Sequence, residues 1–377
     1  MEFKLKDLVN IKYGKNQKNV KNPRGEYPIL GTGGIMDYAD DFLYDKPSVL
    51  IGRKGSIGKV KYIEEPFWTI DTLFYTIVNE NLVIPKYLYY KLSQIDFNYY
   101  NEGTTIPSLR TETLYKIDID LPKKNIQKKV VNLLNTIDEK IENNQKIIAN
   151  LEELSQTLFK RWFVDFEFLD ENGNPYKSSG GEMIDSELGK IPKNWKVDEI
   201  GNYIKIKSGK RPKNKVDSKD SENVVPVIGA SKIMGYTNDY IYNEKIIIIG
   251  RVGTHGVIQR FSTRTWPSDN TFVITSDFES IIYQLLKSID YVSLNRGSTQ
   301  PLLSQKDIKN TKVAMPTNET LLSTYQKENN HVLKMMDQKN IENQKLTQLR
   351  DTLLPKLMSG EIEIPDDIEV NEDELSI

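Results

Sequence analysis

The sequence predicts an α+β protein in which two homologous globular lobes are separated by two long helices. Three observations lead to this prediction: one segment of the chain occurs twice, a long heptad-spaced pattern follows each copy, and short β-branched runs inside each copy end in glycine-containing turns. A chain of 377 residues is too long for one ordinary hydrophobic core, whereas it suits two domains with connecting elements.

The repeat extends over most of each lobe. When residues 27–74 are placed on 225–272, a shift of 198 positions without a gap, 15 of the 48 pairs are identical. GTTIPSL at 103–109 matches GSTQPLL at 297–303, and Gly14-Lys15 matches Gly209-Lys210. Because Gly and Pro restrict the backbone, their recurrence at the same spacing predicts the same turns in both copies.

Each lobe, at residues 1–122 and 195–316, is expected to contain both strands and helices. The runs Ser48–Gly52 and Lys245–Gly250 are short and β-branched, which predicts strands. Residues 83–94 and 278–289 are predicted short helices. The G-R-x-G-x-x-G segments at 52–58 and 250–256 predict a strand–turn–strand hairpin, since a dinucleotide-binding loop would need a following helix.

Two long helices are expected at 123–165 and 317–358, because apolar residues there are spaced alternately by four and three. Asn144 and Asn343 occupy matching positions. A buried Asn at such a position would set helix register and partner, and two solvated Asn residues are the alternative. Residues 166–194 are predicted to be a linker, and 359–377 an acidic tail. The expected helix-packing residues are Leu134, Ile137, Ile141, Asn144, Ile148, Leu151 and Leu158 in the first helix, and Val332, Met336, Asn343, Leu346, Leu353 and Leu357 in the second.

Composition predicts a soluble cytoplasmic protein. Hydrophobic residues make up 38% and charged residues 28% of the chain. No run of eighteen apolar residues and no basic-then-apolar N-terminus is present, so we expect neither a membrane span nor a signal peptide. The chain has no cysteine, which excludes disulfides, thiol catalysis and zinc–thiolate sites and fits a reducing compartment.

Charge is distributed unevenly. The net charge is −2, but residues 359–377 carry eight acidic and no basic side chains, and the rest of the chain has a net charge of +6. Residues 200–316 carry 17 Lys and Arg against 10 Asp and Glu, whereas residues 1–122 balance at 16 and 16. The second lobe therefore favours a polyanionic partner, and charge leaves the first lobe undecided.

No catalytic or metal site is predicted. The two histidines, His255 and His331, share no spacing with carboxylates. The sequence lacks a phosphate-binding P-loop, a serine nucleophile elbow, a nuclease signature and the Asn/Asp-Pro-Pro-aromatic tetrapeptide of adenine methyltransferases.

The repeated motifs contain residues suited to nucleic acid. A turn needs no arginine, so Arg53 and Arg251 are candidates to bind phosphate or guanine, with a salt bridge to Asp71 or Asp269 as the alternative. The hydroxyl-rich loops at 103–109 and 297–303 suit phosphate, although ordinary turn chemistry also explains them. Trp68 and Trp266 are better explained by core packing than by base stacking.

Over its whole length the chain resembles the specificity subunit of type I restriction–modification enzymes. The similarity rests on the repeated motifs, on LSQTLFKRWFVDFEF at 154–168, on SELGKIPKNWKV at 186–197 and on LRDTLLPKLMSGEIEI at 349–364. The resemblance implies that each lobe is a target-recognition domain for one half of a bipartite, asymmetric double-stranded DNA site, spaced by two antiparallel coiled-coil helices.

The resemblance also implies two methyltransferase subunits and one restriction and translocation subunit as partners, with no membrane. S-adenosylmethionine, ATP and Mg²⁺ would belong to those partners, and this chain would hold no cofactor. A helix from residue 126 to 158 would be about 50 Å long, enough to act as a ruler between half-sites. A duplicated coiled-coil adaptor that binds no DNA is the alternative function, and a complete methyltransferase is disfavoured by the missing cofactor motif.

Positions shared by the two lobes are expected to serve the scaffold or phosphate, and equivalent positions that differ are expected to contact bases. For any single lysine, a solvated surface charge is the alternative. The candidate DNA-binding residues are Lys15, Arg53, Lys54, Lys59, Thr104, Thr105 and Arg110 in the first lobe, and Lys210, Arg211, Lys213, Arg251, Thr254, His255, Arg260, Arg264, Ser298 and Thr299 in the second.

Overall fold

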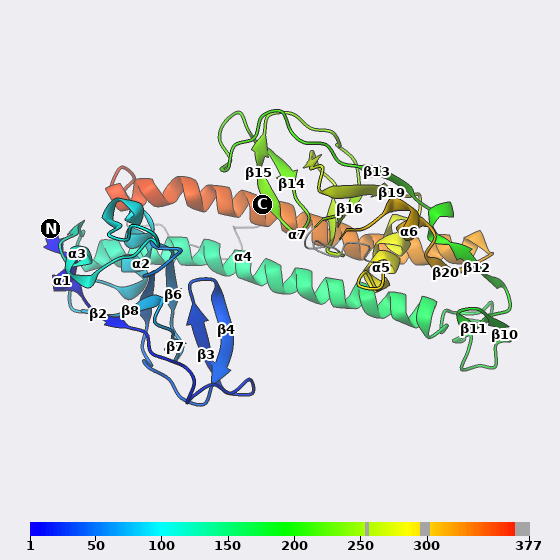
Figure 1. Ribbon diagram of the computed structural model, residues 1–377, viewed down its shortest axis with the longest axis horizontal. Helices are drawn as coiled ribbons and strands as arrows, with labels where there is room; N and C mark the ends of the chain where they lie inside the picture. The colour runs from blue at the N-terminus through cyan, green and yellow to red at the C-terminus, as the bar shows by residue number, and fades with distance from the viewer. Residues whose placement is uncertain (253–255, 295–301, 366–377) are drawn as a thin grey trace. The chain divides into compact units, whose positions relative to one another are not determined.

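The computed structural model describes residues 1–252, 256–294 and 302–365, which divide into two compact units (Figure 1). Unit 1 contains residues 1–142 together with the chain from 343 onward, and unit 2 contains residues 143–342. Helix α4 (Lys124–Phe159) begins in unit 1 and ends in unit 2, and α7 (Glu319–Ser359) runs from unit 2 into unit 1. Each lobe is therefore packed with one part of both helices.

The first lobe contains the shorter elements of unit 1. They are β1 (Glu2–Lys4), α1 (Leu5–Leu8), β2 (Val9–Tyr13), β3 (Tyr27–Gly31), β4 (Gly34–Ala39), β5 (Ser48–Gly52), β6 (Val60–Ile63), β7 (Trp68–Thr69), β8 (Leu73–Val78), α2 (Pro85–Ser93), the 3₁₀ turn η1 (Phe97–Tyr100), α3 (Thr111–Leu114) and β9 (Asp118–Asp120).

Unit 2 contains the linker and the second lobe. Its elements are the π-helical turn η2 (Lys160–Val164), β10 (Met183–Ser186), β11 (Gly189–Pro192), β12 (Trp195–Glu199), the 3₁₀ turn η3 (Ile200–Asn202), β13 (Lys205–Ser208), β14 (Val225–Ile228), β15 (Ile233–Thr237), β16 (Ile246–Gly250), β17 (Ile258–Phe261), β18 (Trp266–Pro267), β19 (Thr271–Thr275), α5 (Glu279–Ser288), α6 (Gln305–Lys309) and β20 (Lys312–Pro316).

The two lobes have the same strand topology. A four-stranded sheet has the order β2-β8-β5-β6 in the first lobe and β13-β19-β16-β17 in the second, and a three-stranded sheet has the orders β4-β3-β7 and β15-β14-β18. In both small sheets the first and third strands in chain order pair in parallel, with Ile29 opposite Trp68 and Val227 opposite Trp266. The duplicated α+β fold predicted from the sequence is confirmed, because the two lobes share both the strand order and the pairing of equivalent residues.

The predicted local elements are also confirmed. The run Ser48–Gly52 is β5 and is wholly buried, and β16 likewise buries all five of its residues. Such unbroken apolar runs are expected of strands covered on both faces. The predicted short helices are α2 and α5, each within the expected range.

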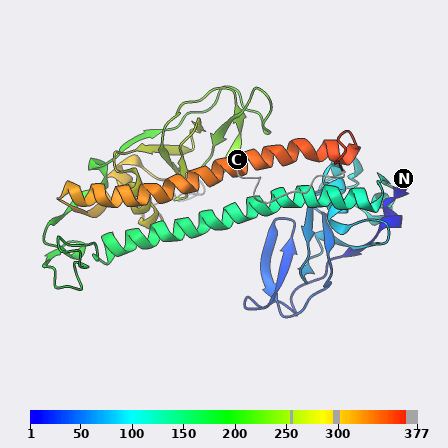
Figure 2. The same cartoon turned by 180° about the vertical axis from the view of Figure 1, so that it is seen from behind.

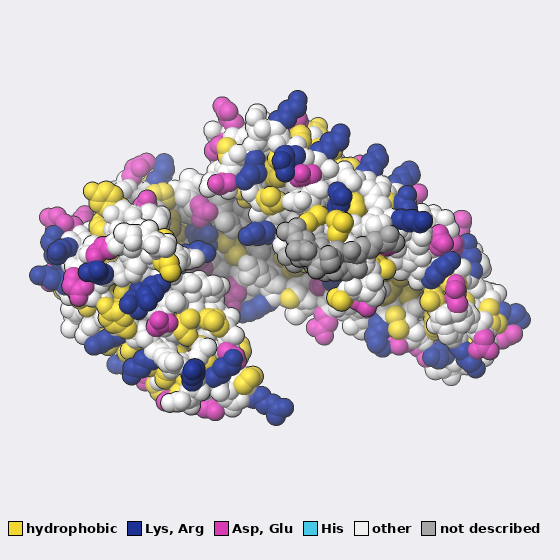
Figure 3. All heavy atoms as spheres, viewed as in Figure 1, with side chains coloured by type: hydrophobic (Ala, Val, Ile, Leu, Met, Phe, Trp, Pro, Cys, Tyr) yellow, Lys and Arg dark blue, Asp and Glu magenta, His cyan; other side chains and the backbone are white. Residues whose placement is uncertain are grey.

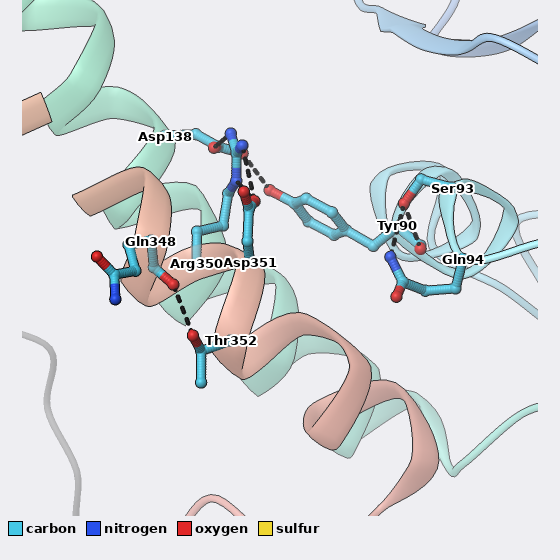
Figure 4. Close-up of polar contacts among 8 residues, drawn as sticks. All are labelled: Tyr90, Ser93, Gln94, Asp138, Gln348, Arg350, Asp351 and Thr352. Atoms are coloured by element: carbon cyan, nitrogen blue, oxygen red, sulfur yellow. Dashed lines mark hydrogen bonds and ion pairs between the residues drawn. The ribbon is translucent and has the colours of Figure 1, made fainter. Parts of the chain in front are cut away.

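In unit 1, parts of α4 and α7 lie side by side and antiparallel (Figures 1 and 2). Arg350 Nη1 donates to Asp138 Oδ1 at 3.0 Å, and Asn343 Nδ2 donates to the Ile141 carbonyl at 3.4 Å, so contact positions rise along one helix as they fall along the other. The lobe is attached at the same place, because Tyr90 on α2 donates to Asp138 Oδ2 at 2.6 Å (Figure 4).

In unit 2, α5 contacts the end of α4 through a polar cluster. The Glu152 carboxylate accepts from the Tyr283 hydroxyl at 3.0 Å and forms an ion pair with Lys287. Gln284 Nε2 donates to Ser155 Oγ at 2.7 Å, which satisfies a hydroxyl that is fully buried. These bonds give the apolar contact a defined orientation, since apolar contacts alone are non-directional.

The expected helix-packing residues differ in burial. Leu134, Ile137, Asn144, Met336, Leu346 and Leu357 are buried, and Ile141, Ile148, Leu151, Leu158, Val332, Asn343 and Leu353 are half-buried. Next to Val332, Leu333 is fully buried instead. A single heptad seam is therefore too narrow a description, because each helix also packs against a lobe. Leu354 and Met358 join the core of unit 1 in this way.

The segment predicted to be a simple linker is more structured than expected. Strands β10 and β11 form an antiparallel hairpin there. Phe168 stacks on Tyr176 at 4.8 Å and on Trp195 at 5.6 Å between ring centroids. The Gly, Ser and Asn content of this segment predicts a linker, but it gives no sign of an aromatic cluster whose members are separated along the sequence.

The Glu152 cluster predicts an acid-sensitive unit 2. Burial raises the pKa of the Glu152 carboxyl, but bonds from Lys287 and other donors outweigh burial and hold that pKa below its ordinary value of 4.5. A lowered folded pKa stabilises the fold above about pH 4.5 and loses that contribution as the pH falls through the folded value. In urea unfolding at pH 7, Glu152→Gln should cost about 1–3 kcal/mol. The cost should shrink toward pH 3.5.

Glu153→Gln is the matched control, because the neighbouring Glu153 side chain is exposed. It should leave the unfolding curves unchanged. If Glu152→Gln lowered the free energy of unfolding equally at pH 7 and pH 3.5, the stabilisation would not come from the ionised Glu152 carboxylate.

Candidate nucleic-acid interface

Four loops of the first lobe are joined into one surface by backbone hydrogen bonds. The Lys15 N–H donates to the Thr69 carbonyl at 2.8 Å, which attaches residues 14–18 to residues 69–72. The Arg53 N–H donates to the Thr72 carbonyl at 2.9 Å, and the Leu109 N–H donates to the Arg53 carbonyl at 2.9 Å. We call residues 14–18, 53–59, 69–72 and 103–109 the loop edge of the first lobe.

The second lobe repeats these bonds with equivalent residues. The Lys210 N–H donates to the Pro267 carbonyl at 2.9 Å, and the Arg251 N–H donates to the Asn270 carbonyl at 2.9 Å. The Leu303 N–H donates to the Arg251 carbonyl at 3.0 Å. The bonds that join the described parts of the loop edge therefore occur in both lobes, beside the hairpins predicted from the G-R-x-G-x-x-G motifs. The pairing of β5 with β6 confirms the first hairpin, and the pairing of β16 with β17 confirms the two strands of the second, although residues 253–255 between them lie outside the described residues.

Two glycine pairs explain why the motifs recur. A β-carbon on Gly14 would lie 2.0 Å from the Ile70 carbonyl oxygen, and one on Gly209 would lie 2.2 Å from that of Ser268. Gly58 and Gly256 have φ of +72° and +76°, a region that side chains rarely adopt. The repeated glycines are thus accounted for by backbone geometry.

The repeated tryptophans hold the loop edge together. Trp68 Nε1 donates to the Lys15 carbonyl at 3.0 Å, and Trp266 Nε1 donates to the Lys210 carbonyl at 2.8 Å. Trp68 is buried and Trp266 is half-buried. Core packing therefore explains Trp68, which clusters with Ile29 and Ala39, as the sequence suggested. Trp266 is held less completely by packing, and in both lobes the indole also fixes one basic loop.

Arg53 and Arg251 lie on aromatic rings at the loop edge. The Arg53 guanidinium lies 4.8 Å from the ring centroid of Tyr13, and its Nη1 donates to the Asp71 backbone carbonyl at 2.9 Å. Arg251 lies 5.6 Å from the centroid of Phe272. Among the described residues, Arg251 Nε is buried and has no hydrogen-bond acceptor.

The salt-bridge alternative for these two arginines is wrong. Arg53 binds the carbonyl of Asp71 rather than its carboxylate, and Asp269 pairs with Arg211 at 3.3 Å. A cation held over a ring keeps its charge available to a ligand, since the ring does not neutralise it. The geometry thus leaves both arginines suitable for an anionic partner.

Most other predicted contact residues lie at the surface, where Figure 3 shows Lys and Arg side chains spread over the visible face of the second lobe. Arg110 forms an exposed ion pair with Glu102 at 3.1 Å, and Arg264 lies 4.9 Å from the ring centroid of Tyr240. The exposed candidates are Lys15, Lys54, Lys59, Thr104, Thr105, Arg110, Lys210, Arg211, Lys213 and Arg264. Thr254, His255, Ser298 and Thr299 lie outside the described residues.

Arg260 was wrongly placed among the DNA-contacting residues. Its side chain is only 6% exposed and forms ion pairs with Glu279 and with Asp337 at 2.6 Å. Burial raises the pKa of Asp337, and Arg260 opposes that effect. Arg260 therefore attaches the second lobe to α7. The sequence does not reveal this role, because Arg260, Glu279 and Asp337 are far apart in the chain.

Lys61 is a cation near the turn of the small sheet that the sequence analysis does not single out. Lys61 Nζ lies 3.6 Å from the position that a β-carbon on Gly34 would occupy, beside the β3–β4 turn. Burial and the nearby charge of Lys59 lower the pKa of Lys61. The sequence offered only a weak signal, since Lys61 aligns with the uncharged Gln259 of the second lobe.

Two searches of the described ranges were negative. Residues 1–252, 256–294 and 302–365 contain no group of three or more His, Cys, Asp or Glu side chains arranged to hold a metal ion. Within those same ranges, every helix is too short or too polar to cross a bilayer.

The family model for the type I restriction modification DNA specificity domain matches residues 1–153 and 192–351, once over each lobe. The chain belongs to this family. It is 27% identical to the type I restriction enzyme MjaIX specificity subunit of Methanocaldococcus jannaschii over 95% of this chain and 86% of that protein. It is 22% identical to the HindI specificity subunit of Haemophilus influenzae over 78% of this chain and 81% of that protein.

A solved structure of a family member shows the same fold. The crystal structure of the S subunit of a type I restriction–modification system from M. genitalium superposes with a TM-score of 0.62 at 22% identity, covering 98% of this chain and 96% of that one. The resemblance inferred from the sequence is confirmed.

The corrected role of Arg260 predicts a loss of stability. Arg260→Met should destabilise unit 2 by about 3–5 kcal/mol in urea unfolding, because it leaves Glu279 and Asp337 without their buried partner. Arg264→Met is the control, since Arg264 is exposed, and should change stability by less than about 0.5 kcal/mol. Unchanged unfolding together with weakened duplex binding by Arg260→Met would restore Arg260 as a contact residue.

Proposed function

We propose that this chain is the DNA sequence-specificity subunit of a type I restriction–modification complex, in which each lobe recognises one half of a bipartite, asymmetric site. The observation that supports this most is the duplicated loop edge. The three described backbone bonds that join its loops are equivalent in both lobes, whereas Lys54 and Lys59 of the first hairpin correspond to Val252 and Val257 of the second. A common scaffold with different tips suits two unlike half-sites.

The shared and unshared residues would have separate tasks. Arg53 in the first lobe and Arg251 in the second occupy equivalent positions, so they would contact phosphate or a base common to both half-sites. Positions that differ, such as Lys54 and Lys59, would discriminate between bases. The net charge of +7 on residues 200–316 supports phosphate contact there. The balanced first lobe would obtain more of its phosphate contact from partner subunits.

Catalysis would belong to other subunits. We expect two methyltransferase subunits to dock on the helices and a restriction and translocation subunit to join them, with S-adenosylmethionine, ATP and Mg²⁺ bound by those partners. Apolar side chains on the helices support protein docking: Ile147 and Leu154 on α4 are 39% and 52% exposed, and Met335 on α7 is 50% exposed. Exposed apolar side chains can contribute to a protein interface where they lie together.

The arginine of the second hairpin gives a test of recognition. In the complex with its methyltransferase subunits, Arg251→Ala should weaken binding of the cognate duplex by about 1–3 kcal/mol. If Arg251 reads a base, the loss of specificity should be confined to one half-site, measured by competition with duplexes altered in either half. Equal weakening for all duplexes would make Arg251 a phosphate contact instead.

A labelled duplex also separates this proposal from the alternative of a DNA-free adaptor. Salt-dependent binding by the unaltered complex is expected, since phosphate contacts release counterions. Absence of any duplex binding by the complex would contradict the proposed function.

The helices should set the distance between half-sites. Helix α4 has 36 residues, or about 54 Å of length at 1.5 Å per residue. Insertion of one heptad into both α4 and α7 should lengthen the spacer of the recognised site by about three base pairs, because seven residues add about 10 Å. Both half-sites should stay the same, as mapped by sequencing methylated adenines in cells. An unchanged spacer would show that the helices do not measure it.

A further inference from the structure

Two large apolar side chains are exposed at equivalent positions of the two lobes. On β4, Ile35 is 57% and Met36 is 55% exposed, and on β15, Ile233 is 44% and Met234 is 40% exposed. Both pairs follow the turn between the first two strands of the small sheet, 198 positions apart. Core packing alone does not require an apolar residue at positions so open to water.

Packing explains only part of this recurrence. A β-carbon on Gly31 would lie 2.4 Å from Met36 Sδ, and one on Gly229 would lie 2.5 Å from Met234 Sδ. Each methionine thus covers a glycine of its turn. In both lobes about half of the methionine and of the neighbouring isoleucine still faces outward, and a ligand common to both lobes would explain that exposure.

The turn adjoins the loop edge in both lobes. The Ile70 N–H donates to the Leu30 carbonyl at 3.1 Å, and in the second lobe the Ser268 N–H donates to the Ile228 carbonyl at 2.9 Å. Residues 69–72 are part of the loop edge and bond to Arg53 through Thr72. The apolar pair is therefore continuous with the surface to which we assign DNA binding.

Cations flank the apolar pair in both lobes, although they come from different positions. In the first lobe Lys61 Nζ lies beside Gly34 of the turn. In the second, the exposed Lys232 lies in the turn itself, and Lys215 Nζ donates to the Met234 carbonyl at 3.0 Å while also pairing with Asp217 at 2.8 Å. An apolar tip with a cation nearby suits a DNA groove, which is bordered by phosphate backbones.

We propose that Ile35 with Met36, and Ile233 with Met234, are apolar wedges that enter a groove of the DNA at each half-site and lie against base pairs whatever their sequence. This inference rests on the proposed function. Ile and Met are among the side chains that proteins insert against base steps. Because both half-sites are duplex DNA, a contact independent of sequence would be the same in the two lobes, as these pairs are.

The test uses the full chain in complex with its methyltransferase subunits and two fluorescent duplexes, one with the recognised site and one without. Met36→Ala, Met234→Ala and Ile35→Ser should each weaken binding of both duplexes by about tenfold. The dependence of affinity on salt should stay unchanged, since an apolar contact releases no counterions. Met36→Leu should keep the unaltered affinity.

Two control variants accompany these. Ile184→Ala changes an apolar residue that is 38% exposed on the β10–β11 hairpin, and it should have no effect on binding. Lys61→Ala should weaken binding and also reduce the salt dependence, which distinguishes a phosphate contact from a wedge. Ile35→Ser keeps the test valid if a methionine variant unfolds, because Ile35 does not cover the turn glycine.

Each result has one meaning. If the unaltered complex binds but the folded variants bind both duplexes equally well, the wedge is excluded and the proposed function remains. If a variant loses methyltransferase subunits while the remaining complex binds DNA normally, the pair docks a protein and the wedge is overturned. Failure of the unaltered complex to bind any duplex would contradict the proposed function itself.

Discussion

A carboxylate at the equivalent helix position of each unit joins a lobe to its helices by directed bonds. Asp138 on α4 and Asp337 on α7 are 199 positions apart, close to the shift that relates the lobes. Asp138 accepts from Tyr90 and Arg350, and Asp337 pairs with Arg260. Burial of apolar surface provides most of the attraction but no direction, so one partnered carboxylate can select a single orientation. In unit 2 the Glu152 cluster adds a second directed contact, and the loops of each lobe are held relative to the helices through these contacts together with the apolar cores.

The loop edge depends on a second constraint, which is the close approach of backbones. Neighbouring backbone leaves no room for a β-carbon at Gly14 or Gly209. The indoles of Trp68 and Trp266 donate hydrogen bonds to the carbonyls of the lysines that follow these two glycines. This scaffold is assembled from backbone groups, so the side chains at its tips can differ without disturbing it. Such an arrangement allows one fold to present different recognition surfaces, and a family of DNA specificity subunits would need that property.

The exposed apolar pairs add a different kind of shared feature. Where the lobes share a buried residue, packing is a sufficient reason. Where they share an exposed isoleucine and methionine, packing of the methionine over a turn glycine explains only part of the recurrence, and we assign the rest to the proposed DNA contact.

The sequence by itself determined the duplication, the α+β class, the hairpins at residues 52–58 and 250–256, the two long helices and the family. These features rest on local backbone preferences and on periodicity, which adjacent residues express directly. Only the tertiary structure decided which charges are available. Arg260 meets Glu279 and Asp337, Asp269 pairs with Arg211, and Arg251 keeps a buried donor without an acceptor among the described residues. The partners of a charge come from distant parts of the chain, and no spacing in the sequence records which of them will meet.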